Sequence, residues 1–330
     1  MLQTPWAHLT PTPAEAAALD EVLLTIVAHD EGKPRCIGNS FVIAAQGRQA
    51  LCMTAAHVLE EARALTQPKA RVSHASMPDV FQSRGPHLWN PGDVAAIATV
   101  GDELIPCAMK RFNYVTSYDV ALFIVEAPHQ RSIFSKFIAL DFGAPSPGDV
   151  VAVAGHQFET SNHQAGLLVE RKLRILGGTV GAVAMLDARQ KQKHAFDMTI
   201  PVEAGLSGSP IIRDPMRAGT LTACGVVSSD ISRPEAIKDS NVAGDSVAAM
   251  LWPAAGLFVP TLMPGESVQH RLFSDLMASK TVANVSDRRV SARAEKLDEG
   301  ILISYVDARR VPTETVQVLL AAPLPKDFAA

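Results

Sequence analysis

Short apolar runs separated by small polar clusters dominate the chain. The runs are rich in Val, Ile and Ala, and Gly, Pro, Asn and Asp bound them, which is typical of strands joined by turns. The pattern predicts strands at residues 22–28, 36–44, 50–54, 94–100, 120–125, 150–154, 179–186, 195–200, 210–212, 221–228 and 247–252. Helical periodicity is weak and predicts helices only at residues 14–20, 56–66 and 269–278. Many short strands without regular intervening helices favour an all-β sandwich or barrel.

A connector divides the strand-rich region into two halves. Residues 135–148 carry two Gly and two Pro between apolar runs on either side. We expect one domain over residues 1–280, with a first half at about 20–135 and a second half at about 148–265.

The last fifty residues differ from the rest of the chain. They open with a polar and charged stretch and then give two β-like runs, at residues 301–306 and 315–320. We therefore treat residues 281–330 as a C-terminal extension of unknown role. Farther upstream, the glycine-rich run at residues 177–181 lacks the Gly-Lys-Ser/Thr ending of a phosphate loop, and a strand with a hairpin turn is expected there.

Composition excludes several classes of protein. Of the 330 residues, 47% are hydrophobic, which is enough for a core and excludes global disorder. The 30 basic and 34 acidic residues give a net charge of −4, which argues against a nucleic-acid partner. No apolar run approaches the roughly 20 residues that span a bilayer, and the first residues lack a secretory signal, so we expect a cytoplasmic protein without a membrane partner.

The cysteines and histidines give no sign of a disulfide framework or a metal site. Four cysteines are too sparse for a disulfide scaffold, and reduced, buried thiols are expected, although Cys36 and Cys52 lie on strands that could be neighbours. His156 and His163 lack metal-like spacing with other ligands, so they are interpreted as surface or pocket-edge side chains. We expect no metal and no cofactor.

Three short segments combine residue types that serve nucleophilic catalysis. A β-like run ends in Thr-Ala-Ala-His at His57, an apolar run begins after Asp119, and Ser207 lies in the sequence Gly-Leu-Ser-Gly-Ser-Pro. A serine hydroxyl is a weak nucleophile at neutral pH and needs an adjacent base, which imidazole can supply. A carboxylate behind the ring fixes the tautomer, as in the worked Ser-His-Asp template. Each residue has an ordinary structural alternative: a turn serine, a core histidine or a strand-end cap.

The glycines beside Ser207 add a second chemical element. Glycine lets a backbone turn tightly enough for two N–H groups to converge on a developing oxyanion. The candidates are the amides of Gly205 and Ser207.

Together these motifs resemble the chymotrypsin-like serine peptidases, over roughly residues 20–265. The resemblance implies an all-β fold of two six-stranded antiparallel β-barrels with few helices, a catalytic triad of His57, Asp119 and Ser207, and a protein or peptide substrate. It also implies that Ser228 supports Asp119. Leu206 and Val58 replace an acid and a cysteine that many secreted members carry, which points to the disulfide-free bacterial branch without zymogen activation.

The resemblance also places the substrate-binding residues. Pro201 stands where many relatives have the base of the primary specificity pocket, and Val227, Ser228 and Ser229 resemble the strand that pairs with substrate. With no acid at position 201, a small or apolar residue before the scissile bond is favoured; Asp230 at the rim is the alternative source of a preference for basic side chains.

We therefore expect an intracellular serine endopeptidase, controlled by a regulatory protein partner or by residues 281–330. A catalytically silent peptide- or protein-binding module on the same fold is the alternative. An α/β-hydrolase is less favoured, because its triad runs Ser, acid, His along the chain and its elbow ends in Gly, where this chain has Ser209.

Overall fold

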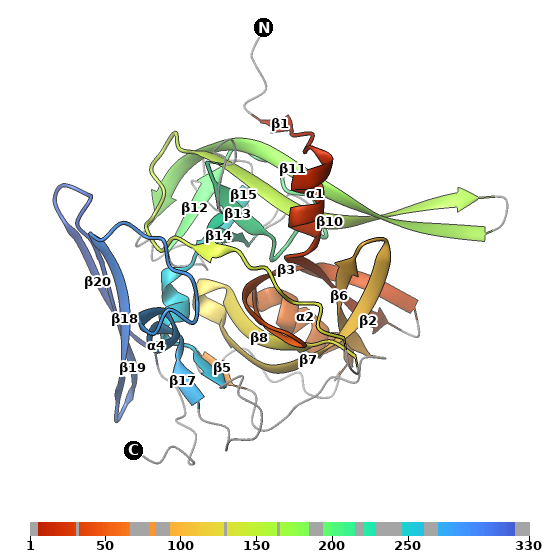
Figure 1. Ribbon diagram of the computed structural model, residues 1–330. Helices are drawn as coiled ribbons and strands as arrows, with labels where there is room; N and C mark the ends of the chain where they lie inside the picture. Colours follow the sequence, from red (N-terminus) through yellow and green to blue (C-terminus); the bar gives the residue numbers. More distant parts are fainter. Residues whose placement is uncertain are drawn as a thin grey trace, which may run out of the picture.

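The structure is a computed structural model, and it describes residues 6–30, 33–66, 80–82, 93–128, 131–163, 166–184, 194–214, 221–228, 246–260 and 270–320. Strands dominate, and two closed barrels lie side by side with a smaller sheet at one end (Figure 1). The barrels confirm the predicted all-β, chymotrypsin-like fold.

The first barrel contains six strands from the N-terminal half. They are β2 (Leu23–Asp30), β3 (Lys33–Gln46), β4 (Gln49–Thr54), β6 (Val94–Val100), β7 (Glu103–Val115) and β8 (Val120–Glu126). The sheet runs in the order β7-β6-β2-β3-β4-β8, and an additional antiparallel pairing of β7 with β8 closes it. Short β5 (Val80–Gln82) pairs with β7 outside this ring.

The second barrel contains six strands from the C-terminal half. They are β10 (Val150–His163), β11 (Gly166–Ala184), β12 (Ala195–Met198), β13 (Pro210–Arg213), β14 (Thr222–Val227) and β15 (Ser246–Met250). The order is β11-β10-β13-β14-β15-β12, and pairing of β11 with β12 closes the ring. Two short strands join its rim: β1 (Ala7–His8) on β11, and β9 (Ala139–Leu140), parallel to β14.

The described helices are few and short. Helix α1 (Pro13–Asp20) begins with a capping box between Thr12 and Glu15, which satisfies two backbone donors of its first turn. Helix α2 (Ala56–Thr66) follows β4 directly, as predicted. The third helix, α4 (Phe273–Ala278), begins later than predicted, because residues 270–272 form strand β17 (His270–Leu272), paired with β16 (Phe258–Pro260). Two 3₁₀ turns complete the set, η3 (Thr116–Tyr118) and η4 (Trp252–Gly256).

The C-terminal residues form a three-stranded antiparallel sheet of β18 (Val290–Leu297), β19 (Gly300–Asp307) and β20 (Glu314–Leu320). The sheet lies against η4, where the fully buried rings of Trp252 and Tyr305 stack with centroids 5.2 Å apart. Arg309 Nη2 also donates to the carbonyl of Ala144, in the connector between the barrels, at 3.0 Å. The extension is thus attached to both the connector and the second barrel's end.

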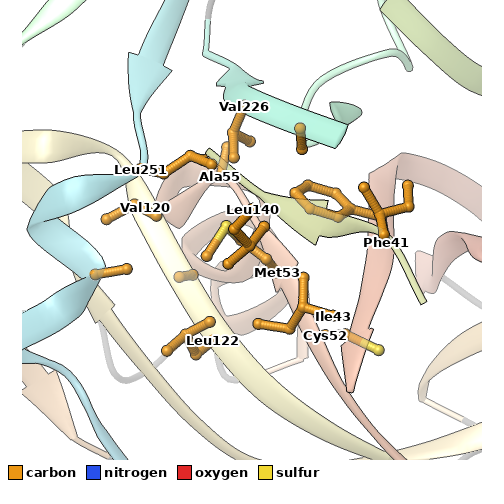
Figure 2. Packing of buried hydrophobic residues seen from close by; sticks show 14 of the residues in the cluster. Phe41, Ile43, Cys52, Met53, Ala55, Val120, Leu122, Leu140, Val226 and Leu251 are labelled. Atoms are coloured by element: carbon orange, nitrogen blue, oxygen red, sulfur yellow. The ribbon is translucent and has the colours of Figure 1, made fainter. Parts of the chain in front are cut away.

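One continuous apolar core supports these elements. Figure 2 shows side chains of β3, β4 and β8 packed together with Leu140 of β9, Val226 of β14 and Leu251. Because the core spans both halves, burial holds the barrels in one fixed arrangement, which a site shared between them requires.

Several local predictions from the sequence were wrong or incomplete, and those for β7 and for residues 177–181 are two of them. Strand β7 was missed because its sequence, Glu-Leu-Ile-Pro-Cys-Ala-Met-Lys-Arg-Phe-Asn-Tyr-Val, carries a proline and three charges among its apolar residues. The glycines of residues 177–181 lie inside β11 and form no hairpin turn. A side chain at Gly178 would meet Ile200, and one at Gly181 would meet Asp197, so these glycines allow close packing.

Candidate active site

His57 lies in the first turn of α2, directly after β4. Ala55 and Ala56, which precede it, are fully buried, so small residues let the helix start close against the barrel wall. The imidazole keeps 27% of its surface exposed while its neighbours are covered. The ring is thus accessible from one side and supported from the other.

Asp119 faces His57 because of strand register. Strands β4 and β8 are antiparallel neighbours, with Thr54 paired to Ala121, so the residues just beyond Thr54 and just before Ala121 meet at one rim of the barrel. Asp119 closes η3 in the left-handed region, at φ 50°, a conformation that Asp tolerates better than most residues.

The carboxylate of Asp119 holds His57 at two points. Oδ1 accepts the backbone N–H of His57 at 2.9 Å, and Oδ2 lies 2.8 Å from Nδ1 of the ring. Asp119 is 3% exposed, so little water competes for these bonds. A carboxylate on Nδ1 favours the tautomer that has its proton there, which leaves the other ring nitrogen, Nε2, as a base.

The second barrel contributes Ser228 to the same carboxylate. Ser228 lies at the end of β14, is buried, and donates its hydroxyl proton to Oδ2 of Asp119. Its backbone N–H donates to the carbonyl of Val247 in the neighbouring strand at 3.0 Å, which fixes its position. The acid from one barrel is therefore held by a hydroxyl from the other.

Ser207 lies in a tight loop between β12 and β13, at 8% exposure. The flanking Gly205 and Gly208 have φ of +93° and +80°, which other residue types rarely adopt. The carbonyl of Ser207 accepts the N–H of Asn39 from the first barrel at 2.7 Å. A side chain on Gly38 would lie 2.7 Å from that carbonyl and 2.8 Å from Val58, so the loop lies close to the helix that carries His57.

The backbone N–H groups of this loop fall into two sets, those with a partner among the described residues and those without one. The N–H of Leu206 donates to Glu203, that of Gly208 to Val227, and that of Ser209 to Leu206. The amides of Gly205 and Ser207 have no acceptor among the residues that the structure describes. These are the two amides that the sequence suggests for an oxyanion hole.

Asn39 is a site residue that sequence reasoning missed. Its fully buried amide reaches from β3 into the second barrel, where Nδ2 donates to the carbonyls of His156 and Gly205 at 2.9 Å and 2.6 Å. The only sequence signal was its place beside Ser40 and Phe41 in a strand next to the His57 segment, where a buried polar residue calls for partners.

The expected substrate-binding residues have different environments. Pro201 is half-buried, next to Ile200, whose carbonyl accepts the hydroxyl of Ser246 at 2.6 Å. Val227 is fully buried, its N–H donates to Ser209 and its carbonyl accepts from Gly208, so it has no N–H to pair with a bound chain. A contact of Val227 with substrate through its side chain stays a prediction.

Two further residues of the specificity argument, Ser229 and the rim candidate Asp230, lie outside the described residues.

The sequence suggests a surface or pocket-edge side chain for His156, and the structure shows that it is not on the surface. It is 1% exposed, and its Nε2 lies 2.6 Å from Asp20 of α1 and 2.8 Å from a guanidinium nitrogen of Arg171. Burial and the Arg171 cation lower the pKa of His156 and outweigh the opposite effect of Asp20. Asn39 contacts the backbone N–H and carbonyl of this same residue, His156.

The four cysteines are free, and Cys36 is partly exposed, whereas the other three are buried. Burial raises the pKa of Cys36 to about 11 and that of Cys224 to about 11, so neither is a thiolate at neutral pH. Within the described residues, no group of three or more His, Cys, Asp or Glu side chains is arranged to hold a metal ion. No helix in the described ranges combines the length and apolar character needed to cross a membrane.

No protein-family model and no curated protein matches the sequence. Several solved structures are similar. "Crystal structure of Deg5" has 11% identity and a TM-score of 0.41, with 73% of this chain and 91% of that chain covered. A scabies mite inactivated protease paralogue, S-D1, has 16% identity and a TM-score of 0.39, with 71% of this chain and 88% of that chain covered. Catalytically active tobacco etch virus protease complexed with product has 11% identity and a TM-score of 0.34, with 80% of this chain and 86% of that chain covered.

The order of strands in the two barrels carries the fold assignment. Each barrel is a closed ring of six antiparallel strands, and His57, Asp119 and Ser207 lie where the rings meet. The chain has a chymotrypsin-like fold of two six-stranded antiparallel barrels.

Proposed function

We propose that the protein is a serine endopeptidase that hydrolyses peptide bonds through an acyl-enzyme on Ser207. The observation that carries the proposal is the double contact of Asp119 with the backbone and the ring of His57, at 2.9 Å and 2.8 Å. A structural histidine needs one satisfied nitrogen, whereas a general base needs a ring held in one tautomer and one orientation. The contact from Ser228 fixes the carboxylate in turn.

The proposed reaction has two halves. Ser207 Oγ attacks the carbonyl carbon of the scissile bond while His57 Nε2 takes the hydroxyl proton, and the carbonyl oxygen becomes an oxyanion. The C–N bond then breaks, and the imidazolium gives its proton to the departing amine. In the second half, water attacks the ester carbon and gives a proton to His57, which returns it to Ser207 as the acid product leaves. No metal or organic cofactor takes part in this scheme.

The amides of Gly205 and Ser207 are proposed to stabilise the oxyanion. Both lack an acceptor among the described residues and belong to a loop that two positive-φ glycines turn sharply. Preorganised donors of this kind lower the barrier by about 3–4 kcal/mol per donor in acyl-transfer enzymes.

Substrate preference, regulation and location are parts of the same proposal. We propose a small or apolar residue before the scissile bond, because Pro201 supplies no charge at the pocket position. Leu206 gives no carboxylate for zymogen activation, so control falls to a partner protein or to the extension at residues 281–330. A cytoplasmic location and a place in the disulfide-free bacterial branch are supported by the four free thiols.

The experiment compares peptide hydrolysis by wild type, Ser207→Ala and Ser209→Ala. Ser209 is a matched control, because it is a fully buried serine two residues away whose hydroxyl has no partner among the described residues. Each protein is incubated with a denatured protein mixture, and new N-termini are counted by mass spectrometry. We expect cleavage by wild type and Ser209→Ala, and none by Ser207→Ala.

Cleavage by Ser207→Ala at the wild-type rate would overturn the proposal. The alternative function, a silent peptide-binding module, predicts a different pattern: wild type and Ser207→Ala would both retain peptides on a column, and neither would cut them.

A further inference from the structure

The loop that carries Ser207 needs a support that its own sequence does not supply. Gly205 and Gly208 allow many backbone conformations, and fixing them has an entropic cost. Leu206 is buried and apolar, so no ion pair from that position can hold the loop. An oxyanion hole works only when its donors are already in place before the reaction.

Asn39, from the opposite barrel, contacts the loop and can supply this support. Its Nδ2 donates to the carbonyl of Gly205, and its backbone N–H donates to the carbonyl of Ser207, at 2.6 Å and 2.7 Å. One residue of β3 therefore binds both residues whose amides are the candidate oxyanion donors. Its own carbonyl accepts the hydroxyl of Thr54, next to the His57 segment, at 2.6 Å.

The orientation of the Asn39 amide is determined by its surroundings. Oδ1 accepts the backbone N–H of His156 at 2.9 Å, so Nδ2 must point the other way, toward the carbonyls of His156 and Gly205. A flipped amide would place its oxygen against two carbonyl oxygens and its NH₂ against an N–H. The His156 segment is itself held, because its ring contacts Asp20 and Arg171.

The backbone of the loop at Gly208 packs tightly against Asn39 and Thr54. A side chain on Gly208 would lie 2.2 Å from the Asn39 carbonyl oxygen and 2.2 Å from the Thr54 hydroxyl. The backbone of the loop is thus in direct contact with the same residue that binds it on either side of Leu206.

We propose that Asn39 is a positioning residue that holds the Gly205–Ser207 backbone in an oxyanion-binding conformation without proteolytic activation. The inference rests on the proposed serine peptidase function and adds how its catalytic loop is kept competent. Asn39 does not touch the substrate in this account; it acts through the carbonyls of Gly205 and Ser207.

The test replaces Asn39 by Asp, which keeps the shape and the Oδ1 acceptor but removes the NH₂ group. Asn113→Asp is the matched control, because Asn113 is also a buried asparagine of the first barrel whose Nδ2 donates to one carbonyl, that of Phe258, at 2.6 Å. Asn39→Ala removes both Nδ2 hydrogen bonds, to Gly205 and His156, together with the Oδ1 acceptor, and it buries no charge. Folding of each variant is checked by thermal unfolding, and all rates are measured below every midpoint.

The readout is the rate of Ser207 labelling by a fluorophosphonate, separated into a maximal rate and an apparent binding constant. A misplaced oxyanion loop lowers the maximal rate by about 100-fold and leaves the binding constant within about threefold. We expect that result for both Asn39 variants and a maximal rate within about threefold of wild type for Asn113→Asp.

Three outcomes would overturn the inference: labelling of a folded Asn39 variant at the wild-type rate, an equal loss in Asn113→Asp, or unfolding of both Asn39 variants while Asn113→Asp folds. If wild type itself does not label, the serine peptidase proposal fails. Amide hydrogen exchange then decides the inference. Faster exchange at residues 205–209 in Asn39→Asp, with β4 unchanged, supports it, and unchanged exchange at residues 205–209 overturns it.

Discussion

The two barrels have the same topology but contribute to the candidate site in different ways. Numbered within each half, the strands follow one cyclic order, first-second-third-sixth-fifth-fourth, in both rings. In the first barrel, His57 and Asp119 lie beyond adjoining ends of the paired strands β4 and β8. In the second barrel, Ser207 lies in the loop between β12 and β13, and Ser228 lies at the end of β14.

The difference teaches that the strand framework determines where the loops meet, whereas loop residues determine the chemistry. Strand register brings His57 to Asp119, and Ser228 of the second barrel then holds the Asp119 carboxylate. The Ser207 loop has no such pairing, and glycine conformations with contacts from Asn39 fix it. We expect a change of charge in the first half of the site to affect the labelling of Ser207. In the second half, we expect atoms added close to the loop backbone to affect stability.

The largest expected effect follows from changing the charge in the first barrel. Asp119→Asn keeps the shape of the side chain but favours the wrong tautomer of His57, and should lower the rate of Ser207 labelling about 10³–10⁴-fold. Thermal unfolding is measured in parallel to show that the fold is retained. A labelling rate within tenfold of wild type would show that the contact between Asp119 and His57 has no catalytic role.

The next largest effect is expected from adding a Cβ atom to a tightly packed glycine of the Ser207 loop. Gly208→Ala combines a positive φ with a Cβ that would lie 2.2 Å from two oxygen atoms, and should destabilise the protein by about 3–5 kcal/mol. Gly148→Ala is the matched control, because its φ is +87° and nothing lies within 4 Å of the added carbon, so about 1–2 kcal/mol is expected. Urea unfolding measures both, and equal losses would contradict the packing argument.

The smallest effect concerns the buried His156 between α1 and the second barrel. The pKa of His156 is lowered in the folded state by burial, so below about pH 6.5 the unfolded state binds the extra proton. The contribution of His156 to stability is therefore complete when the pH is above the pKa that His156 has in the unfolded state. This contribution is lost as the pH falls below that pKa.

The His156 ring contacts Asp20 and Arg171, and the guanidinium of Arg171 also contacts Thr99. The test variant His156→Gln leaves these three residues intact. Urea unfolding at pH 7.5 and 5.5 should show a smaller pH dependence in this variant than in wild type. An equal dependence would mean that His156 does not carry this effect.

Local sequence patterns predicted much of the fold and part of the candidate site. Strand β6 and helix α2 have the predicted boundaries, because Asp93 and Gly101 flank the apolar run of β6 and Pro68 closely follows α2 in the sequence. Strand β18 was missed, since its alternation of Ala, Arg, Glu and Lys has few large apolar residues. The motifs around His57, Asp119 and Ser207 were visible because each is contiguous.

Contacts between residues far apart in the chain were not predictable from one sequence. Asn39 and Gly205 are separated by 166 residues, and no local pattern reports their hydrogen bond. The same holds for His156, whose ring contacts Asp20 of α1, and for Tyr305, which stacks on Trp252. Long-range polar contacts follow from the packing of the barrels, which the sequence specifies only through the whole core.

The central claim is that the barrel junction activates Ser207. Its most direct test is reaction with a fluorophosphonate, followed by digestion and mass spectrometry to locate the adduct, in wild type, Ser207→Ala and Ser209→Ala. The account predicts one adduct, on Ser207, in wild type and Ser209→Ala, and none in Ser207→Ala. An unlabelled wild type, or labelling that persists in Ser207→Ala, would contradict it.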